Sequence, residues 1–118
     1  MPAGDAHALY RRWLFELWAG QTAVAREILA EDFQGHWPDR ETAGRDAAIA
    51  RIAETLDMFE ETTFEVAVGP LAEGDLVAAR WTGVGRTSDS ELSFFGNDVL
   101  RTAEGRFVEY WGASSPGS

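Results

Sequence analysis

The spacing of apolar residues changes once along this chain, from a helical repeat before residue 60 to alternation after it. The first segment has apolar side chains three and four residues apart: Leu9, Tyr10, Trp13, Leu14, Leu17 and Trp18. From Thr62 onward, Phe64, Val66 and Val68 alternate with Glu65 and Ala67. Helical spacing followed by period-two spacing indicates helices and then strands. This order predicts an α+β fold, with the helices on one face of a curved antiparallel sheet.

Three helices are expected before residue 60. Asp5 can cap the first and Gly20 can end it. A short second helix should begin at Thr22 as N-cap. The third should begin near Gly44. The side chains expected to face inward from the second and third helices are Val24, Ile28, Leu29, Ile49, Ile52, Ala53, Leu56 and Phe59.

Four strands are expected after the change in spacing, at residues 62–70, 76–86, 92–103 and 106–114. The sequence A-E-G-R, from Ala103 to Arg106, has the composition of a tight turn. We therefore expect the last two strands to pair as a hairpin.

Length and charge limit the classes of function. A chain of 118 residues is expected to form one domain, 1–118, that buries roughly two thirds of its unfolded surface. Twenty acidic against ten basic residues give a net charge of −10, which repels phosphate backbones and anionic lipid surfaces. We expect neither nucleic acid nor a membrane as partner.

The sequence lacks cysteines, a signal peptide and long apolar runs, and these absences bear on where the protein is found. No cysteine is present, which excludes disulfides and thiolate metal sites and fits a reducing compartment. The N-terminus lacks a signal-peptide pattern, and no apolar run reaches the ~20 residues that span a bilayer. A soluble, cytoplasmic protein is the expectation. Five Trp, seven Phe and two Tyr favour a small hydrophobic ligand.

Several separated stretches resemble one family in the same order along the chain. They are LYRRWLFELWAGQ, ILAEDFQGHWPDRETAGRDAAIARI, AEGDLVAARWTGVG and FFGNDVLRTAEGRFVEYW. Together they are similar to SnoaL-like polyketide cyclases of the nuclear-transport-factor-2-like superfamily. The resemblance implies that the sheet is cone-shaped, with the three N-terminal helices packed on its concave side around an apolar pocket. It also implies acid/base chemistry without cofactor or metal, and a homodimer.

Strand alternation and the resemblance together predict which side chains reach that cavity. The resemblance places the Arg80 face of strand 76–86 inside. The full inward set is then Leu76, Ala78, Arg80, Thr82, Val84, Phe94, Gly96, Asp98, Leu100, Val108, Tyr110 and Gly112. The outward set is Val77, Ala79, Trp81, Asn97, Val99, Arg101, Phe107, Glu109 and Trp111.

Asp98 is the expected catalytic acid/base. A carboxylate among Phe94, Phe95 and Leu100 is partly desolvated, which raises its pKa toward the range that suits proton transfer. In the cyclases that this chain resembles, an Asp at this place removes a proton α to a carbonyl and returns one to the other oxygen. Arg80 is expected to orient Asp98 and to stabilise an enolate. The alternative is a structural Asp98–Arg80 ion pair.

His36, in the sequence GHWPDR, is the second catalytic candidate. The resemblance places it at the rim of the pocket, where a histidine could donate a hydrogen bond to a carbonyl or shuttle a proton near neutral pH. The alternative is a histidine bonded to the loop backbone. His7 is expected to be exposed, and neither histidine has a second ligand at metal spacing.

Six residues are expected to contact the substrate: Trp13, Trp37, Tyr110, Phe94, Thr82 and Leu100. The tryptophans could instead belong to the core, and Tyr110 could be satisfied by the backbone. Trp81 and Trp111 share the expected outer face, where exposed indoles would call for a second copy of the chain. We therefore expect a homodimer through the outer sheet face.

Three departures from the family pattern narrow the chemistry. Gly112 stands where many relatives carry an acid, and Arg80-Trp81-Thr82 replaces the Arg-x-Asp of epoxide hydrolases. The segment GRTSDSELSF is shorter than the usual hairpin loop, which argues against a large polycyclic substrate. Two hypotheses remain: a cyclase or isomerase that acts on a small hydrophobic carbonyl compound such as a polyketide intermediate, and a non-catalytic module that binds a small ligand or a protein.

Overall fold

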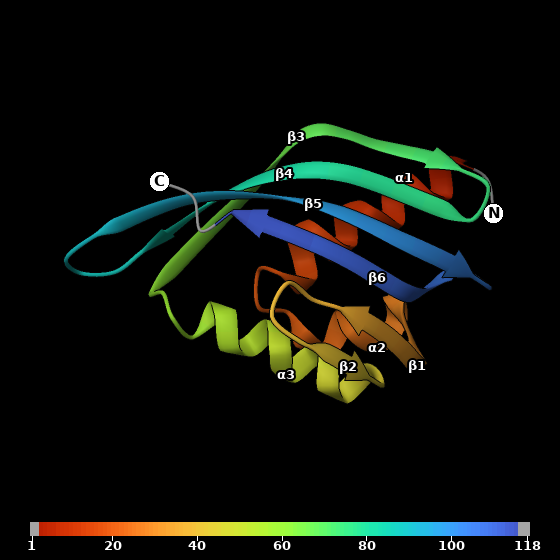
Figure 1. Ribbon diagram of the computed structural model, residues 1–118, viewed down its shortest axis with the longest axis horizontal. Helices are drawn as coiled ribbons and strands as arrows, with labels where there is room; N and C mark the ends of the chain where they lie inside the picture. The colour runs from red at the N-terminus through yellow and green to blue at the C-terminus, as the bar shows by residue number, and fades with distance from the viewer. Residues whose placement is uncertain (1–2, 116–118) are drawn as a thin grey trace.

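The computed structural model describes residues 3–115, and its side chains from residue 5 onward. Its elements in chain order are α1 (Ala3–Arg12), η1 (Trp13–Leu17), η2 (Thr22–Val24), α2 (Ala25–Ile28), β1 (Leu29–His36), β2 (Glu41–Ala43), α3 (Arg45–Leu56), β3 (Glu61–Glu73), β4 (Leu76–Arg86), β5 (Glu91–Ala103) and β6 (Arg106–Ser115). The helices lie on one side of a long curved sheet, with α1 crossing beneath β3, β4 and β5 (Figure 1). The predicted α+β class is confirmed. Within the described residues, no helix is long and apolar enough to cross a membrane.

The first helical segment combines an α-helix with a π-helical turn. After Arg12 the chain continues as a π-helical turn, η1, whose residues Trp13, Leu14 and Leu17 are buried. Gly20 follows with φ +98°, a conformation that glycine adopts at little cost, and the helical path ends there as expected. Asp5 lies inside α1 rather than at its cap.

The second helix is shorter than the spacing predicts. Thr22 opens a 3₁₀ turn instead of capping a helix, and no side chain caps either short helix. Leu29, expected at the end of this helix, begins β1. Strands β1 and β2 were not predicted because residues 29–36, LAEDFQGH, mix charged residues with a glycine and lack clean alternation.

The six strands form one open sheet in the order β2-β1-β6-β5-β4-β3. All neighbouring strands are antiparallel except β1 and β6, which run parallel. The sequence pattern predicts a wholly antiparallel sheet, so this one pair differs from the expectation. The hairpin between β5 and β6 is confirmed: Ala103 pairs with Arg106 across Glu104 and Gly105, both at positive φ.

The register of β4 reverses the face expected for that strand. Ala79 lies opposite Asp98 on β5, and residues directly opposite each other point to the same face of a sheet. The residues of β4 that face the helices are therefore Val77, Ala79, Trp81, Gly83 and Gly85. Leu76, Arg80 and Thr82 are exposed on the other face.

A β-bulge changes the inward set of β6. Leu100 pairs with Tyr110 but Thr102 pairs with Phe107, so one extra residue of β6 is accommodated between them. Phe107 and Tyr110 are consequently both buried on the concave face. The expectation that Phe107 points outward and Val108 inward is wrong, because simple alternation does not continue through a bulge.

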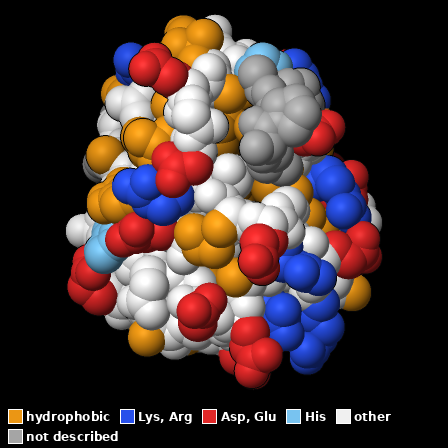
Figure 2. Space-filling view, turned by 90° about the vertical axis from the view of Figure 1, so that its right-hand side faces the viewer, with side chains coloured by type: hydrophobic (Ala, Val, Ile, Leu, Met, Phe, Trp, Pro, Cys, Tyr) orange, Lys and Arg blue, Asp and Glu red, His pale blue; other side chains and the backbone are white. Residues whose placement is uncertain are grey.

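The core lies between the helices and the concave face of the sheet. It joins side chains of α1, η1 and α2 with those of β1, α3 and the three C-terminal strands β4, β5 and β6. The largest fully buried side chains are Trp13, Tyr10, Phe33, Phe107, Leu17, Ile28, Leu29, Ile52, Leu100 and Val77. One end of the molecule, seen in Figure 2, bears acidic and basic side chains interspersed with apolar ones rather than a field of one sign.

Candidate active site

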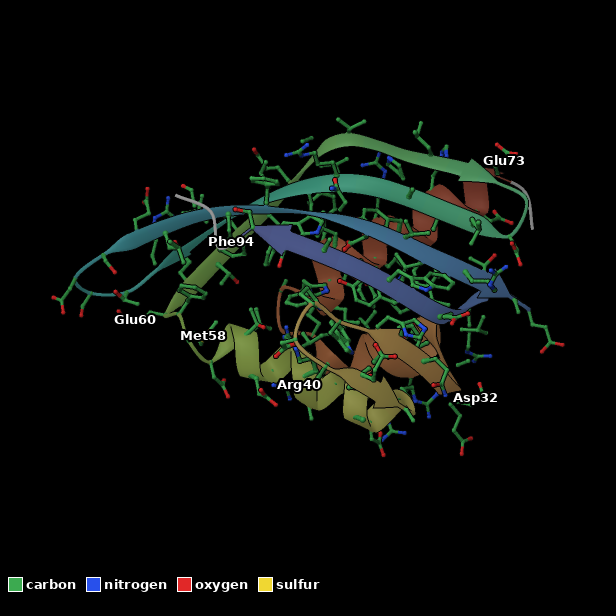
Figure 3. The ribbon with its side chains drawn as sticks, viewed as in Figure 1. Asp32, Arg40, Met58, Glu60, Glu73 and Phe94 are labelled. Carbon is green, nitrogen blue, oxygen red and sulfur yellow. The ribbon has the colours of Figure 1, made fainter. Side chains whose placement is uncertain are left out.

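A cavity of about 260 Å³ opens between α3, η1 and the concave face of the sheet. Its wall is mostly aromatic and aliphatic. The lining residues are Leu14, Trp18, Trp37, Pro38, Arg51, Thr55, Met58, Phe59, Phe64, Trp81, Leu92, Phe94, Asp98, Tyr110, Ser114 and Ser115. Two of them are labelled in Figure 3: Met58, just after α3, and Phe94, on β5. A space of this size and composition suits a small, largely apolar ligand.

Asp98 is the one buried carboxylate among the described residues, with 3 % of its surface exposed. Its Oδ2 atom accepts hydrogen bonds from the Tyr10 hydroxyl at 2.9 Å and from Trp13 Nε1 at 3.2 Å. Its Oδ1 atom accepts one from Trp81 Nε1 at 3.1 Å. Because an ionised carboxylate offers about four acceptor positions, these three donors leave room for a fourth.

Burial and hydrogen bonding act in opposite directions on the pKa of Asp98. Desolvation raises it, while hydrogen bonds from Tyr10, Trp81, Trp13 and Tyr110 lower it, and the net result is a pKa of about 6. Both protonation states of Asp98 are therefore accessible near neutral pH. That property suits a general acid/base.

The two tyrosines near Asp98 remain protonated. Burial, followed by the negative charge of Asp98 and a hydrogen bond to it, raises the pKa of Tyr10 and of Tyr110 far above the ordinary phenol value. Both hydroxyls therefore act as donors. Tyr110 lines the cavity, so its hydroxyl can donate either to Asp98 or to a ligand oxygen.

Two glycines make room for the aromatic donors. A Cβ atom on Gly96 would lie 2.4 Å from the Trp81 ring, and one on Gly112 would clash with the Tyr110 hydroxyl. Because glycine has no side chain, Trp81 and Tyr110 can lie across the concave face at these two positions. Gly112 therefore accommodates the Tyr110 side chain.

The structure brings four of the sequence-predicted site residues together and separates the others. Asp98, Trp37, Tyr110 and Phe94 line the cavity. Trp13 and Leu100 are fully buried in the core without lining it, although Trp13 binds Asp98. Thr82, Arg80 and His36 are not in the wall.

Arg80 lies on the opposite face of the sheet from Asp98. It pairs with Asn97, is exposed, and stacks over the Phe95 ring at 4.3 Å from its centroid. From this face Arg80 cannot reach a ligand in the cavity, and it forms no ion pair with Asp98. The expectation was wrong because it took the inward face of β4 from the resemblance and not from the pairing of β4 with β5. Thr82 lies on the same exposed face as Arg80, so its predicted contact with the substrate is wrong for the same reason.

His36 also lies outside the cavity. Its Nε2 atom is 2.8 Å from Glu109 Oε2, its Nδ1 atom contacts Glu41, and its ring stacks on Trp111. Hydrogen bonds that the His36 ring donates to Glu109 and Glu41 raise its pKa. His36 therefore bridges β1, β2 and β6 on the outer face, rather than at the rim of the pocket or on the loop backbone.

Trp81 does not lie on the outer face, where it was expected. Its indole points into the cavity and binds Asp98, so it is absent from the surface proposed for dimer contacts. Trp111 does lie on the outer face, where it is half-buried between His36 and Arg101.

Sequence reasoning missed Tyr10 and Arg51 as site residues. Tyr10 shares the helical face of Trp13 and reads as core, and only the long-range contact with Asp98 reveals its role. Arg51 shares α3 with the apolar face of Ile52, and nothing in the local pattern distinguishes it from a surface arginine. Within the described residues no cluster of three metal-ligating side chains occurs.

An open curved sheet that encloses an aromatic cavity with helices, and a buried carboxylate in that cavity, define a protein of the nuclear-transport-factor-2-like fold. The chain belongs to the family of the SnoaL-like domain, whose sequence model matches residues 10–110. Comparison with curated proteins found no significant match.

Solved structures with the same fold are similar over nearly the whole chain. A provisionally named SnoaL-like polyketide cyclase from Jannaschia sp. CCS1 is 19% identical with a TM-score of 0.85, covering 96% of this chain and 87% of its own. AclR from Streptomyces galilaeus, provisionally named a hydroxylase, is 19% identical with a TM-score of 0.82, covering 97% and 91%. IdmH from Streptomyces antibioticus, provisionally named a polyketide cyclase, is 20% identical with a TM-score of 0.80, covering 92% and 90%. These names span different chemistries, so the fold alone does not decide the reaction.

Proposed function

We propose that this protein is a cofactor-independent cyclase or isomerase that acts on a small hydrophobic carbonyl compound, such as a polyketide intermediate, by acid/base catalysis at Asp98. The observation that carries the proposal is one buried carboxylate, with a pKa of about 6, in the wall of an aromatic cavity. Membership of the SnoaL-like family supports the same reaction class.

The reaction begins with proton removal. The Asp98 carboxylate takes a proton from the carbon α to a ligand carbonyl, and the electron pair of the C–H bond becomes an enolate. Tyr110 donates its hydroxyl hydrogen bond to the enolate oxygen instead of to Asp98, which stabilises the developing charge. The apolar wall excludes water and so strengthens that interaction.

The enolate then has two outcomes. In a cyclisation, its carbon attacks a second carbonyl of the same molecule, a C–C bond forms, and protonated Asp98 returns its proton to the new alkoxide. In an isomerisation, the proton returns to a different carbon of the conjugated system. Each path regenerates ionised Asp98 and needs neither an oxidant nor a reductant.

A deuterium-exchange experiment tests this proposal without knowledge of the natural substrate. β-Tetralone, a bicyclic ketone with acidic α-hydrogens, is incubated with the protein in D₂O, and the loss of its α-proton signals is followed by NMR. The wild type should accelerate exchange with saturation. Asp98→Asn should lower the rate by roughly 10²–10⁴, the range of a lost general acid/base. An equal rate in both proteins would contradict the proposal.

One observation favours a second candidate function, a module that binds a small ligand without changing it. Asp98 already accepts three well-formed hydrogen bonds, which is also what a purely structural carboxylate would show. In that case, β-tetralone should bind to the wild type while its exchange rate stays at the value in buffer.

A further inference from the structure

Arg51 places a positive charge in the wall of the cavity. It lies on α3, its side chain is 14% exposed, and among the described residues it is the one basic side chain that lines this space. A largely buried cation beside an apolar cavity is costly unless anionic or polar groups compensate it. Its partners therefore decide what the charge can do.

Three contacts fix the orientation of the guanidinium. Arg51 Nε donates to Asp39 Oδ1 at 3.0 Å, and Nη1 donates to Thr55 Oγ1 at 2.6 Å. The Cζ atom lies 5.1 Å from the centroid of the Trp37 ring, which itself lines the cavity. The remaining nitrogen, Nη2, has no hydrogen-bond partner among the described residues. One edge of the planar group is thus held in place with donors to spare.

The carboxylate that faces Arg51 is shared with a second arginine. Asp39 Oδ2 accepts hydrogen bonds from Arg40 Nη2 at 3.1 Å and from Arg40 Nε at 3.3 Å. Arg40 in turn makes two bonds of 2.7 Å to Glu54. Burial acts to raise the pKa of Asp39, but hydrogen bonds from Arg51 and Arg40 outweigh it and lower the pKa, so Asp39 remains charged. Asp39 and Glu54 together balance the charges of Arg51 and Arg40, but their contacts leave Nη2 of Arg51 available to donate to a ligand.

The charge of Arg51 also acts across the cavity. Burial and the nearby Asp98 raise the pKa of Tyr110, and the positive charge of Arg51 opposes part of that rise. Arg51 and Tyr110 therefore belong to the same electrostatic environment. A ligand in the cavity would meet a fixed cation on the helix side and the Asp98 carboxylate on the sheet side.

We propose that Arg51 binds an anionic oxygen of the ligand, so that the cavity takes small aromatic or conjugated molecules bearing a carboxylate or enolate in preference to neutral molecules of the same shape. This inference deepens the proposed function, because it names the substrate class of the same cavity. It makes Arg51 a specificity-determining residue, with Nη2 of its guanidinium donating to a carboxylate oxygen of the ligand.

The cavity volume limits the size of such a ligand. Pockets for drug-sized ligands usually measure about 300–1,000 Å³. At about 260 Å³, this cavity lies below that range and suits a one- or two-ring compound. Naphthylacetic acid and its neutral amide are therefore suitable probes, since they share one shape and differ in charge at one end.

The experiment measures calorimetric dissociation constants of the two probes for wild type, Arg51→Gln, Arg51→Lys and Arg40→Gln at pH 7.5. Arg40 is the matched control because it also binds Asp39, and its loss removes the same charge outside the cavity wall. The wild type should bind the carboxylate more tightly than the amide. Arg51→Gln should weaken carboxylate binding by about 10- to 100-fold, the worth of a charge-assisted hydrogen bond, and leave the amide within about threefold.

Two further results complete the expected pattern. Arg51→Lys should keep part of the preference, because it retains the charge but not the planar donors, and Arg40→Gln should keep all of it. Retained amide binding shows that the variants are folded. The proposal is overturned if the wild type shows no preference for the carboxylate or does not bind it at all. It is equally overturned if Arg51→Gln weakens both probes alike, or if Arg40→Gln reproduces its effect.

The same proteins separate this inference from the proposed function. Asp98→Asn should lose β-tetralone exchange while keeping the preference for the carboxylate probe. A normal exchange rate in Asp98→Asn together with a lost preference in Arg51→Gln would overturn the catalytic role alone. A slow Asp98→Asn with an unchanged preference in Arg51→Gln would overturn the anion site alone.

Discussion

Trp81 on β4 donates its indole N–H to Oδ1 of Asp98 on β5 at 3.1 Å, although the two residues lie on neighbouring strands and not directly opposite each other. The contact is diagonal: Trp81 pairs with Gly96, and Gly96 has no side chain to keep the indole away from Asp98. This hydrogen bond joins an aromatic side chain of the cavity wall directly to the ionisable group of the cavity. It also shows which face of β4 is the inner one.

Replacing Trp81 should shift the pH dependence of any reaction at Asp98. Trp81→Phe removes a hydrogen bond that lowers the pKa of Asp98, so that pKa should rise above about 6. If ionised Asp98 is the base, the acidic limb of the β-tetralone exchange rate should move to higher pH. Trp18→Phe is the matched control, because Trp18 lines the cavity without bonding Asp98. A limb that moves equally in both variants would show that cavity shape is responsible.

Asp98 should make folding stability depend on pH in the direction opposite to that of a salt-bridged carboxylate. Its pKa is about 6 in the folded chain against 3.8 for the ordinary group, so the folded state holds the proton longer than the unfolded state does. The stability from Asp98 is therefore full below about pH 3.8 and is lost as pH rises to about 6, by about 3 kcal/mol in total.

Asp98→Asn isolates this effect. Asparagine accepts at one oxygen only, so an indole N–H of Trp13 or Trp81 is left without an acceptor, and the variant should be less stable by about 1–3 kcal/mol. Urea unfolding at several pH values measures the difference. The deficit of Asp98→Asn should be largest near pH 4 and smaller at pH 7. A deficit that grows with pH would mean that Asp98 is not raised in pKa.

His36→Gln should affect stability but not chemistry. Hydrogen bonds to Glu109 and Glu41 raise the pKa of His36, so its stabilising contribution is present below pH 6.5 and is lost as pH rises through the higher folded value. The variant should therefore be less stable than the wild type at pH 6 and closer to it at pH 9. Its β-tetralone exchange rate should equal that of the wild type, because the imidazole lies outside the cavity. A rate reduced at every pH would reinstate His36 as a catalytic residue.

We propose that a second copy of the chain covers the outer face of the sheet. Trp81 is absent from this face, and the exposed apolar side chains there are Leu71 and Val68 on β3, Leu76 on β4 and Phe95 on β5, beside the half-buried Trp111 on β6. Several such side chains together offer a few kcal/mol of apolar burial at ~25 cal/mol per Å². Light scattering at micromolar concentration should give a dimer, and Phe95→Glu should shift it toward monomer. A monomeric wild type would contradict this assembly.

The architecture could largely be predicted from the sequence because its main signals are local. The helical spacing around Trp13 and the alternation after Thr62 each report burial within one element. The turn at Glu104 and Gly105 is likewise encoded in its own residues. Strand β1 was missed because its partner β6 is distant in sequence and its own residues do not alternate.

The site was harder to predict because it depends on register. Asp98 and Tyr110 could be identified from the resemblance and from alternation. The register of β4 places Trp81 rather than Arg80 beside Asp98, and the bulge in β6 places Phe107 rather than Val108 inside. A shift of one residue moves every side chain of a strand to the other face. Arg51 and Tyr10 depend on contacts between elements that no local pattern records.

The central claim is that Asp98 exchanges its proton near pH 6 and that this group drives the chemistry of the cavity. The most direct test is a carboxyl ¹³C NMR titration of the wild type, with Asp98→Asn to assign the signal, beside the pH profile of β-tetralone exchange. The account predicts a carboxyl midpoint at about pH 6 that coincides with the acidic limb of the rate. A carboxyl group that stays ionised to below pH 4, or a rate limb at a different pH, would contradict it.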